Sequence, residues 1–217
     1  MIRHHPSREL LMDYASGAAL PGAALAVASH VAFCRRCAAD VARLEAVGGE
    51  LLLASSAKQP VGQHVLHALL ARLDQPEPVG PPLPDFDADT CRLLPPPLRR
   101  YLGRNLGDLD WRRIAGIFDE VPLSLSSRGE KASLLRLMPA CPVPPHSHYG
   151  HELILVLDGG FVDEDGQYNR GDFATLYPGD VHHPVIDGES GCMCLVVVDG
   201  PVRLLDGTDI FSDPSWV

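Results

Sequence analysis

Three residues of the types that bind zinc lie close together in the stretch HVAFCRRC, which begins at His30. If this stretch is helical, His30, Cys34 and Cys37 fall at positions i, i+4 and i+7, within an arc of roughly 60°. One helix face then offers an imidazole nitrogen and two thiolates to a tetrahedral zinc ion, and a distant residue must supply the fourth ligand. His4 and His5 are the two candidates for that ligand. The alternative is an exposed, reducible cysteine pair.

Four residues in the C-terminal half form a second pattern of a different kind: His146, His148, Glu152 and His182. Along a strand, His146 and His148 point to the same side, and Glu152 can reach that side from the next strand. Three imidazoles and one carboxylate make a harder site, which zinc, manganese, iron and nickel all accept. The sequence therefore predicts a second metal site, with a chance grouping of polar residues in a β domain as the alternative.

Two histidines and two cysteines stand beside this second pattern. His183 alternates to the other face of the strand from His182, so we expect a structural role for it, and His151 is expected to be exposed or to support Glu152. Cys192 and Cys194 share one strand face, with side chains roughly 7 Å apart. They are either plain core residues or a redox-sensitive pair near the second metal.

The first 74 residues have the apolar periodicity of helices. Ser7 can cap the first helix, which Gly17 closes, and Pro21 suits the first turn of the second. The expected helices cover residues 7–17, 22–34, 36–53 and 62–73, with Gly48 and Gly49 as a weak point in the third. Because the second helix is rich in alanine, it cannot supply a large core, and a structural zinc ion is the expected staple.

Residues 75–97 contain eight prolines, so we expect a semi-stiff, polyproline-like linker without regular structure. Beyond it, short strand-forming runs alternate with turns such as Asp158-Gly159-Gly160 and Asp165-Gly166. The expected strands cover residues 111–118, 133–138, 152–158, 160–163, 172–177 and 192–199. Many short strands at this spacing indicate a sandwich or a barrel.

Charge and hydropathy argue against two classes of partner. The 217 residues carry a formal net charge of −10. Residues 1–74 contain seven Lys/Arg and six Asp/Glu, whereas residues 75–217 contain eleven Lys/Arg and twenty-two Asp/Glu. Neither half offers the basic field that binding to nucleic-acid phosphates requires. No apolar run reaches the ~20 residues of a membrane span, and the N-terminus lacks the apolar core of a signal peptide. We therefore expect a cytoplasmic protein with no direct contact to nucleic acid or membrane.

Several motifs occur in an order that resembles a known family. His146-x-His148-x3-Glu152-x6-Gly159 matches the first cupin motif, although Ala140 stands where that motif usually begins with glycine. Gly171-Asp172-x5-Pro178-Gly179-x2-His182 matches the second cupin motif. Residues 1–74 resemble zinc-binding anti-sigma domains, whose hallmark is H-x3-C-x2-C with an upstream histidine. Together with Cys192-Met193-Cys194, this order resembles the ChrR family of anti-sigma factors.

The resemblance implies a two-domain α + β chain. Residues 1–74 would form an all-α bundle with a structural zinc ion, residues 75–97 a linker, and residues 98–217 a cupin β-barrel, or double-stranded β-helix. It favours His5 over His4 as the fourth ligand of the first site, and it points to zinc in the second site, giving two zinc ions per chain.

The resemblance also implies a function. Proteins of the family bind a group IV (extracytoplasmic-function, or ECF, sigma-E-like) sigma factor through the helical domain, here expected as a 1:1 heterodimer. They block its contacts with core RNA polymerase and release it under singlet-oxygen or related oxidative stress, a response that needs the cupin domain. No catalytic turnover is required for this.

Two other functions compete with the regulator. A metal-dependent cupin dioxygenase or isomerase with a helical appendage would use the same three histidines and one glutamate for oxygen chemistry if the ion were iron. The identity of the metal and turnover of small diketones, sugars or thiols would distinguish it. A free-standing DNA-binding zinc-finger protein is disfavoured by the acidic C-terminal half and the lack of a basic helix.

Overall fold

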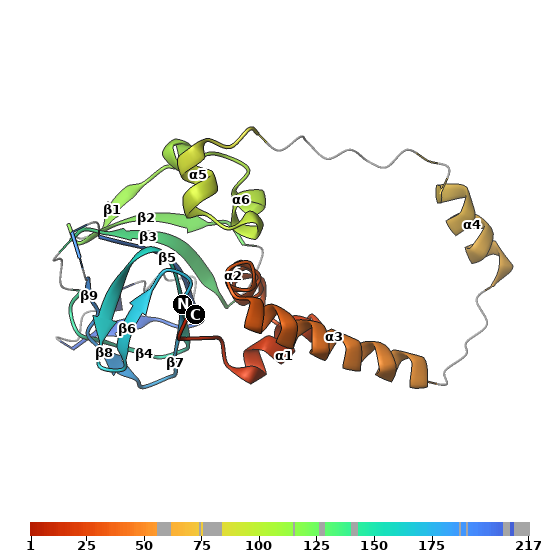
Figure 1. The fold of residues 1–217 in the computed structure, drawn as a ribbon, viewed down its shortest axis with the longest axis horizontal. Helices are drawn as coiled ribbons and strands as arrows, with labels where there is room; N and C mark the ends of the chain where they lie inside the picture. Colours follow the sequence, from red (N-terminus) through yellow and green to blue (C-terminus); the bar gives the residue numbers. More distant parts are fainter. Residues whose placement is uncertain are drawn as a thin grey trace.

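The computed structural model describes residues 1–55, 62–73, 75, 84–114, 116–125, 129–139, 143–186, 188–189, 191–205 and 209–210. Figure 1 shows a β domain with helices of the N-terminal half beside it and two short helices across one end. Within the described ranges no single helix is long and apolar enough to cross a membrane, although the first two helices together pass that test across a bend of 106°.

The N-terminal half is helical, as its periodicity predicts. Its helices are α1 (Arg8–Ser16), α2 (Pro21–Val31), α3 (Arg35–Ala54) and α4 (Gln63–Leu73). The Ser7 side chain caps α1 by accepting a hydrogen bond from the Leu10 N–H, and Gly17 ends the helix in the left-handed conformation at φ 76°. The expected weak point in the third helix is wrong, because α3 runs without a break through Gly48 and Gly49.

The expectation that residues 75–97 lack regular structure is also wrong for part of that segment. Helix α5 (Ala88–Leu93) begins at the N-cap Asp87, and α6 (Pro96–Leu102) takes Pro96 at its first turn, where a missing N–H costs nothing. Leu94 and Leu98 are both buried in the core of the β domain, so this part of the segment belongs to the domain that follows it. Residues 76–83 lie outside the described part of the chain.

The β domain is built from two antiparallel sheets. The larger sheet has the order β1-β2-β3-β10-β5-β6, with β7 and β9 also paired to β5, and the smaller has the order β12-β11-β4-β8. The larger sheet comprises β1 (Arg112–Ile114), β2 (Phe118–Leu123), β3 (Lys131–Leu137), β5 (Glu152–Asp163), β6 (Gly166–Asn169), β7 (Phe173–Leu176), β9 (Val185–Ile186) and β10 (Cys192–Val198). The smaller comprises β4 (His146–His148), β8 (Val181–His182), β11 (Val202–Leu204) and β12 (Asp209–Ile210).

Strand β10 supplies both hydrophobic cores of the β domain, because successive side chains point to opposite faces. Met193, Leu195 and Val197 pack into the core beneath α2, α5 and α6. The alternate residues, including Cys192 and Cys194, pack into the core between the two sheets. Every residue of β10 is buried, as expected for a strand covered on both faces.

Strand β5 differs from its prediction. We expected a turn at Asp158-Gly159-Gly160, but β5 continues through these residues to Asp163. The pairing with β10 shifts register between Met193 and Cys194, and Gly159 adopts φ 67° beside the Gly191 carbonyl, where a Cβ atom would clash. The glycines therefore form an irregularity within one strand. The Asp165-Gly166 turn is confirmed as the connection from β5 to β6.

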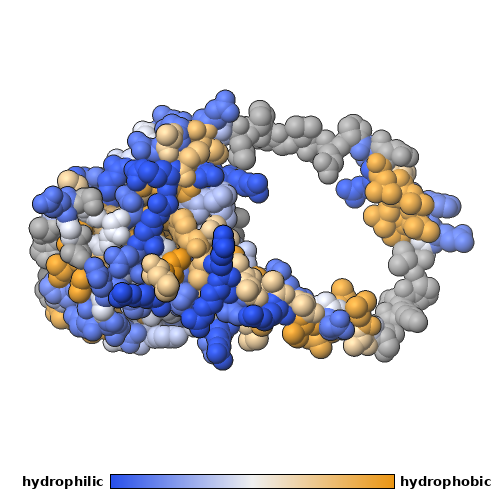
Figure 2. Space-filling model, in the orientation of Figure 1, coloured by the Kyte–Doolittle hydropathy of each residue, from blue (hydrophilic) through white to orange (hydrophobic). Residues whose placement is uncertain are grey.

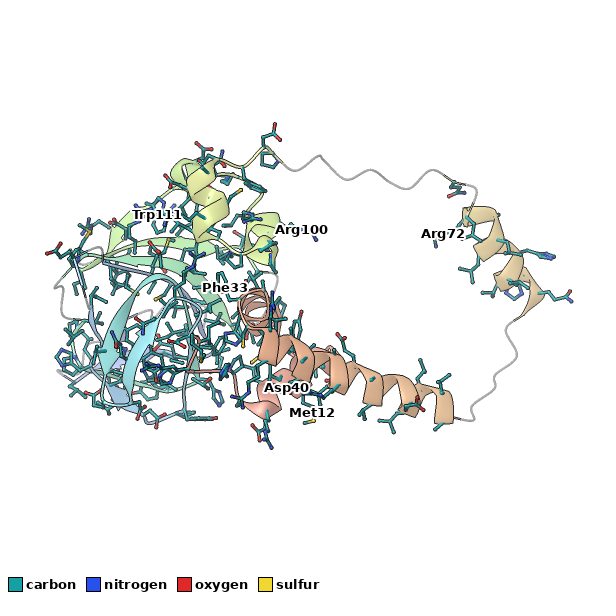
Figure 3. The ribbon with its side chains drawn as sticks, in the orientation of Figure 1. Met12, Phe33, Asp40, Arg72, Arg100 and Trp111 are labelled. Atoms are coloured by element: carbon teal, nitrogen blue, oxygen red, sulfur yellow. The ribbon has the colours of Figure 1, made fainter. Side chains whose placement is uncertain are left out.

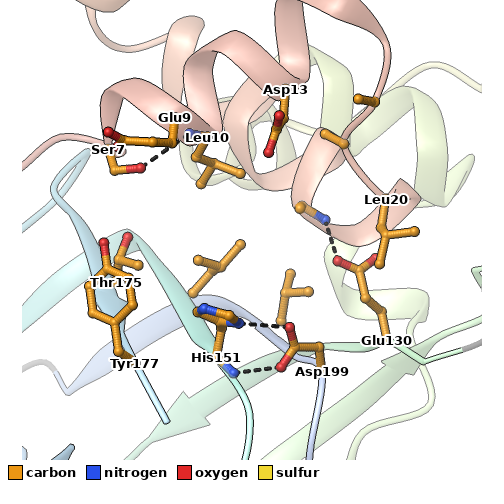
Figure 4. A pocket seen from close by; sticks show the side chains of 15 residues that line it. Ser7, Glu9, Leu10, Asp13, Leu20, Glu130, His151, Thr175, Tyr177 and Asp199 are labelled. Carbon is orange, nitrogen blue, oxygen red and sulfur yellow. Dashed lines mark hydrogen bonds and ion pairs between the residues drawn. The ribbon is translucent and has the colours of Figure 1, made fainter.

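Helix α2 docks directly on the β domain. Its small residues Ala23 and Ala26 are buried in the core that β10 shares, so the helix approaches the sheet closely. Its N-cap residue Leu20 makes no side-chain cap, and Glu130 of the β domain takes that role by accepting from the Gly22 N–H at 2.8 Å and the Ala23 N–H at 3.3 Å. Figure 4 shows Glu130 at the edge of a cavity of about 540 Å³ between the helices and the sheet.

This cap generates a prediction. Replacing Glu130 by alanine removes the only side chain in the described part of the chain that bonds the first amides of α2. We expect Glu130→Ala to lower the free energy of unfolding by about 0.5–2 kcal/mol, the usual cost of a lost helix cap. Urea unfolding measures the change. Glu45→Ala, on the exposed side of α3, is the control and should change stability by less than ~0.5 kcal/mol; equal effects would disprove the capping role.

Two candidate metal centres

The first candidate centre lies where the N-terminal arm meets the corner between α2 and α3. His30 lies in the last turn of α2, which ends at Val31. Cys34 is the N-cap of α3 in an extended conformation at φ −112° and ψ 102°, and Cys37 lies in the first turn of α3. The motif therefore spans a corner rather than one helix face, and the second helix ends three residues before the expected position.

The four side chains of this centre have the spacing of a tetrahedral site. His5 Nδ1 lies 3.5 Å from Cys34 Sγ and 3.4 Å from Cys37 Sγ, and His30 Nε2 lies 3.3 Å from Cys37 Sγ. Ligand atoms around a tetrahedral zinc ion with ordinary Zn–N and Zn–S bonds are roughly 3.5 Å apart. The donor set and its dimensions therefore fit zinc without rearrangement.

The structure also distinguishes the two N-terminal histidines. The ring of His4 packs against Tyr168 with 4.1 Å between ring centroids, so it is turned toward the β domain. The ring of His5, next along the arm, lies edge-on to His30 at 5.7 Å. His5 and not His4 is therefore brought to the thiols.

Burial favours the uncharged forms of the Cys37 thiol and the His30 imidazole, so thiolate ligands in this cluster need a cation. It raises the pKa of the Cys37 thiol to about 12 and lowers the pKa of His30 to about 4. Zinc requires thiolates and neutral imidazoles as ligands. His30 is already held neutral, and a bound divalent ion supplies the positive charge that a pair of buried thiolates needs. The electrostatics therefore match a structural metal.

The second candidate centre joins the two sheets. His146 and His148 lie on β4 and His182 on β8, where His146 and His182 are paired residues of the smaller sheet. Glu152, at the start of β5, comes from the larger sheet. His146 Nε2 lies 2.8 Å from His182 Nε2, and Glu152 Oε2 lies 3.4 Å from His182 Nε2 and 3.7 Å from His148 Nε2. All four side chains converge, and each of the four residues is at most 5% exposed.

Unpartnered polar atoms in this cluster are what a bound metal ion would satisfy. Both ring nitrogens of His148 and Oε2 of Glu152 are buried without a hydrogen-bond partner. Burial lowers the pKa of His146 to about 4, which keeps its imidazole neutral. A buried polar atom without a partner costs free energy, and one divalent ion would satisfy one ring nitrogen of His148 together with Oε2 of Glu152. The residues present therefore fit a divalent metal, and three imidazoles with one carboxylate leave its identity open.

Sequence reasoning missed one residue of this centre, Asp163 at the end of β5. Its carboxylate lies 3.6 Å from His182 Nδ1, with only 3% of the side chain exposed. Burial acts to lower the pKa of His182, but the contacts with Asp163 and Glu152 raise it to about 9. A carboxylate behind a ligating histidine is a common orienting partner. The only sequence signal was an acidic residue next to the Asp165-Gly166 turn.

The histidines and cysteines next to the second centre differ in their surroundings. His151 is exposed and pairs with Asp199 at 2.9 Å, and the half-buried His183 donates its backbone N–H to Glu164. The expected 7 Å between Cys192 and Cys194 is wrong, because the register shift beside them brings the two sulfur atoms to 3.3 Å. Both thiols line a small cavity of about 60 Å³ with His146, Glu152 and His182.

Comparisons with known proteins agree with this architecture. Residues 102–203 match the family described as the ChrR cupin-like domain. The anti-sigma-E factor ChrR of Cereibacter sphaeroides is 36% identical over 203 residues, which cover 93% of this chain and 92% of that protein. A chain in the crystal structure of Rhodobacter sphaeroides SigE in complex with the anti-sigma ChrR is 33% identical, with a TM-score of 0.78, over 92% of this chain and 100% of that chain.

The protein is therefore of a class in which a helical region with a cysteine–histidine cluster precedes a cupin-like β domain. The chain belongs to the ChrR family of anti-sigma factors. The predicted fold class is confirmed, and so is the prediction of a regulator rather than an enzyme.

The two clusters generate a prediction of metal content. The purified chain should bind close to two divalent ions. Cys37→Ser and His148→Ala should each lower the content to about one, because each removes a ligand from a different cluster. Elemental analysis gives the count. His183→Ala, next to a ligand but outside the cluster, is the control and should keep both ions. Loss of both ions in either single variant would show that the two centres are not independent.

Proposed function

We propose that this chain binds an ECF-type sigma factor as a 1:1 heterodimer in the cytoplasm and keeps that factor from core RNA polymerase. The match to a chain of the SigE–ChrR complex supports this proposal over nearly the full length. The observation that carries it is an exposed apolar surface on the two helices that extend furthest from the β domain (Figure 1).

This apolar surface belongs to α4 and the C-terminal half of α3. Helix α4 buries none of its residues and stands apart from the β domain, with the side chain of Arg72 on the side that faces the rest of the molecule (Figure 3). Apolar residues dominate both segments (Figure 2). The members, with exposures between 40% and 80%, are Val47, Leu51, Leu52, Leu53, Val65, Leu66, Leu69, Leu70 and Leu73. Exposed apolar patches of this kind mark protein–protein interfaces, and an amphipathic helix commonly binds in a groove of its partner.

The proposed inhibition is steric. A sigma factor that contacts α3 and α4 would have its polymerase-binding surface covered, so no turnover is needed. Zinc in the first centre would act as a structural ion that ties the N-terminal arm to the corner between α2 and α3. Since Cys34 is the N-cap of α3, this centre fixes the start of a helix whose other end belongs to the proposed interface.

We assign the release of sigma to the β domain and its second metal, with zinc as the ion and singlet oxygen or a related oxidant as the signal. Two features support a sensory role near this centre. The Glu152 and histidine ligands are deeply buried, and the thiols of Cys192 and Cys194 are in contact in the same cavity.

The size of this cavity argues against the rival enzyme function. Substrate pockets usually enclose about 300–1,000 Å³, whereas the cavity beside the second centre has about 60 Å³ and is lined mostly by apolar side chains. It can admit a molecule of about the size of dioxygen, but a diketone or a sugar does not fit without a rearrangement of the β domain.

The proposed interface is tested on α4. Leu70→Asp places a charge in the apolar surface, and we expect it to weaken sigma binding at least tenfold, because a charge buried at an interface costs more than ~1.4 kcal/mol. Ala71→Asp adds the same charge on the opposite face of the helix and should bind nearly as the parent chain does. Titration calorimetry with the purified sigma factor gives both affinities. Equal affinities for the two variants would exclude α4 from the interface.

The sensory role is tested on the second centre. His146→Ala, His148→Ala, Glu152→Ala and His182→Ala should each keep repression in unstressed cells and weaken the release of sigma after singlet-oxygen exposure, because each removes a ligand. A sigma-dependent reporter gives the readout, with His151→Ala as the control. Cys192→Ser with Cys194→Ser should match these variants if the thiols carry redox chemistry, and should have a smaller effect if they are core residues. If all four ligand variants release sigma as the parent chain does, the second centre is not the sensor, and Cys34 and Cys37 become the candidates.

A further inference from the structure

The β domain holds the N-terminal arm that carries His5. The Asp172 carboxylate accepts hydrogen bonds from the Arg3 N–H at 2.6 Å and the His4 N–H at 3.0 Å. The His4 carbonyl in turn accepts from the Phe173 N–H at 3.2 Å. Three hydrogen bonds from the turn before β7 therefore fix the backbone directly before His5.

The same turn holds a second ligand of the first centre. His30 Nδ1 lies 2.9 Å from the Gly171 carbonyl oxygen. Because a carbonyl only accepts, Nδ1 carries the proton and donates it, which leaves the lone pair of Nε2 free for a metal. Nε2 is the atom that faces Cys37. Adjacent residues of the β domain thus orient two of the four ligand side chains of the helical domain.

This turn is itself rigidly built into the β domain. Asp172 is 1% exposed, and its second carboxylate oxygen accepts from the Asn169 N–H at 2.8 Å. The Gly171 N–H donates to the Val156 carbonyl of β5 at 2.8 Å, and the Val156 N–H donates to the Asp172 carbonyl at 3.1 Å. The turn can therefore not follow the helical domain if that domain moves away.

Gly171 also makes room for the arm. It adopts φ 89°, and a Cβ atom there would lie 2.8 Å from the side chain of Ile2. The arm thus packs against the backbone of the turn over the residues from Ile2 to His4. The absence of a side chain at Gly171 therefore lets Ile2 lie close to the backbone of the turn.

We propose that Gly171 and Asp172 are positioning residues for the zinc ion of the helical domain, so that zinc binding and the docking of the two domains stabilise each other. The inference rests on the proposed zinc occupancy of the first centre. Hydrogen-bond partners behind the ligands of a metal commonly account for 10- to 100-fold in its affinity. In this chain those partners belong to the β domain, so zinc binding is coupled to the docking of the two domains. Such a coupling is reciprocal by thermodynamic necessity: each process strengthens the other.

The proposal gives the β domain a physical route to the sigma-binding helices. Val156, which anchors the turn, lies on β5 four residues after Glu152 of the second centre. A change in β5 that displaced the turn would weaken zinc binding at the start of α3. Conversely, a domain separated from this turn would bind zinc less tightly than the full chain does.

Cobalt(II) binding to the full-length chain tests the proposal. Cobalt takes the place of zinc in tetrahedral sites, and its sulfur-to-metal charge-transfer band reports the first centre alone, since the second has no thiolate ligand. Arg3→Pro removes the N–H that Asp172 accepts without altering the β domain, whereas Arg3→Ala keeps that N–H and is the matched control. We expect about a tenfold weaker affinity for Arg3→Pro and the parental affinity for Arg3→Ala.

A variant of the turn itself completes the test. Asp172→Ala should weaken cobalt affinity about 10- to 100-fold, with the same band at saturation because the ligands are unchanged. If Asp172→Ala does not fold, the Arg3 pair decides. If Arg3→Pro binds cobalt with the affinity of the parent chain, the inference is wrong, but the zinc site is unaffected. Absence of the thiolate band in the parent chain overturns the zinc site and the inference together.

Discussion

The cost of removing charge from water is the constraint on which both metal clusters depend. Apart from the half-buried His5, the thiols, imidazoles and carboxylate of the two clusters are buried, where an uncompensated charge is costly. Their ionised forms need a cation to balance them. Each cluster also lies at a junction, between the arm and the α2–α3 corner in one case and between the two sheets in the other. An ion that neutralises the cluster therefore also joins two parts of the chain.

Strand β5 is the element that both junctions share. It begins at Glu152, bonds the turn beneath the N-terminal arm through Val156, and ends at Asp163 behind His182. Through its pairing with β10 it also forms part of both hydrophobic cores. Because β5 is one continuous strand from Glu152 to Asp163, no loop separates the second centre from the turn beneath the arm. The glycines that suggested a turn instead form an irregularity that keeps the strand intact.

The sequence predicted what depends on local spacing and missed what depends on contacts between distant segments. The helices, the two ligand clusters and the Asp165-Gly166 turn follow from periodicity, residue type and turn chemistry. The folding of α5 and α6 was missed because proline content indicates a linker unless Leu94 and Leu98 have a core to enter, and that core comes from remote strands. The roles of Glu130, Asp163 and Asp172 were invisible for the same reason, since each acts on a residue brought close only by the fold.

Helix α4 has a consequence for how tightly a partner can be held. It has 11 residues and buries none of them, whereas an isolated helix shorter than about 12–15 residues is marginal in water. Contacts with the rest of the described chain therefore add little to the stability of α4, and a partner that needs the helical form contributes to ordering it. This folding-upon-binding penalty subtracts from the affinity that the apolar area alone would give. A complex weakened in this way can dissociate after a small loss of contact elsewhere, as the proposed release of sigma requires.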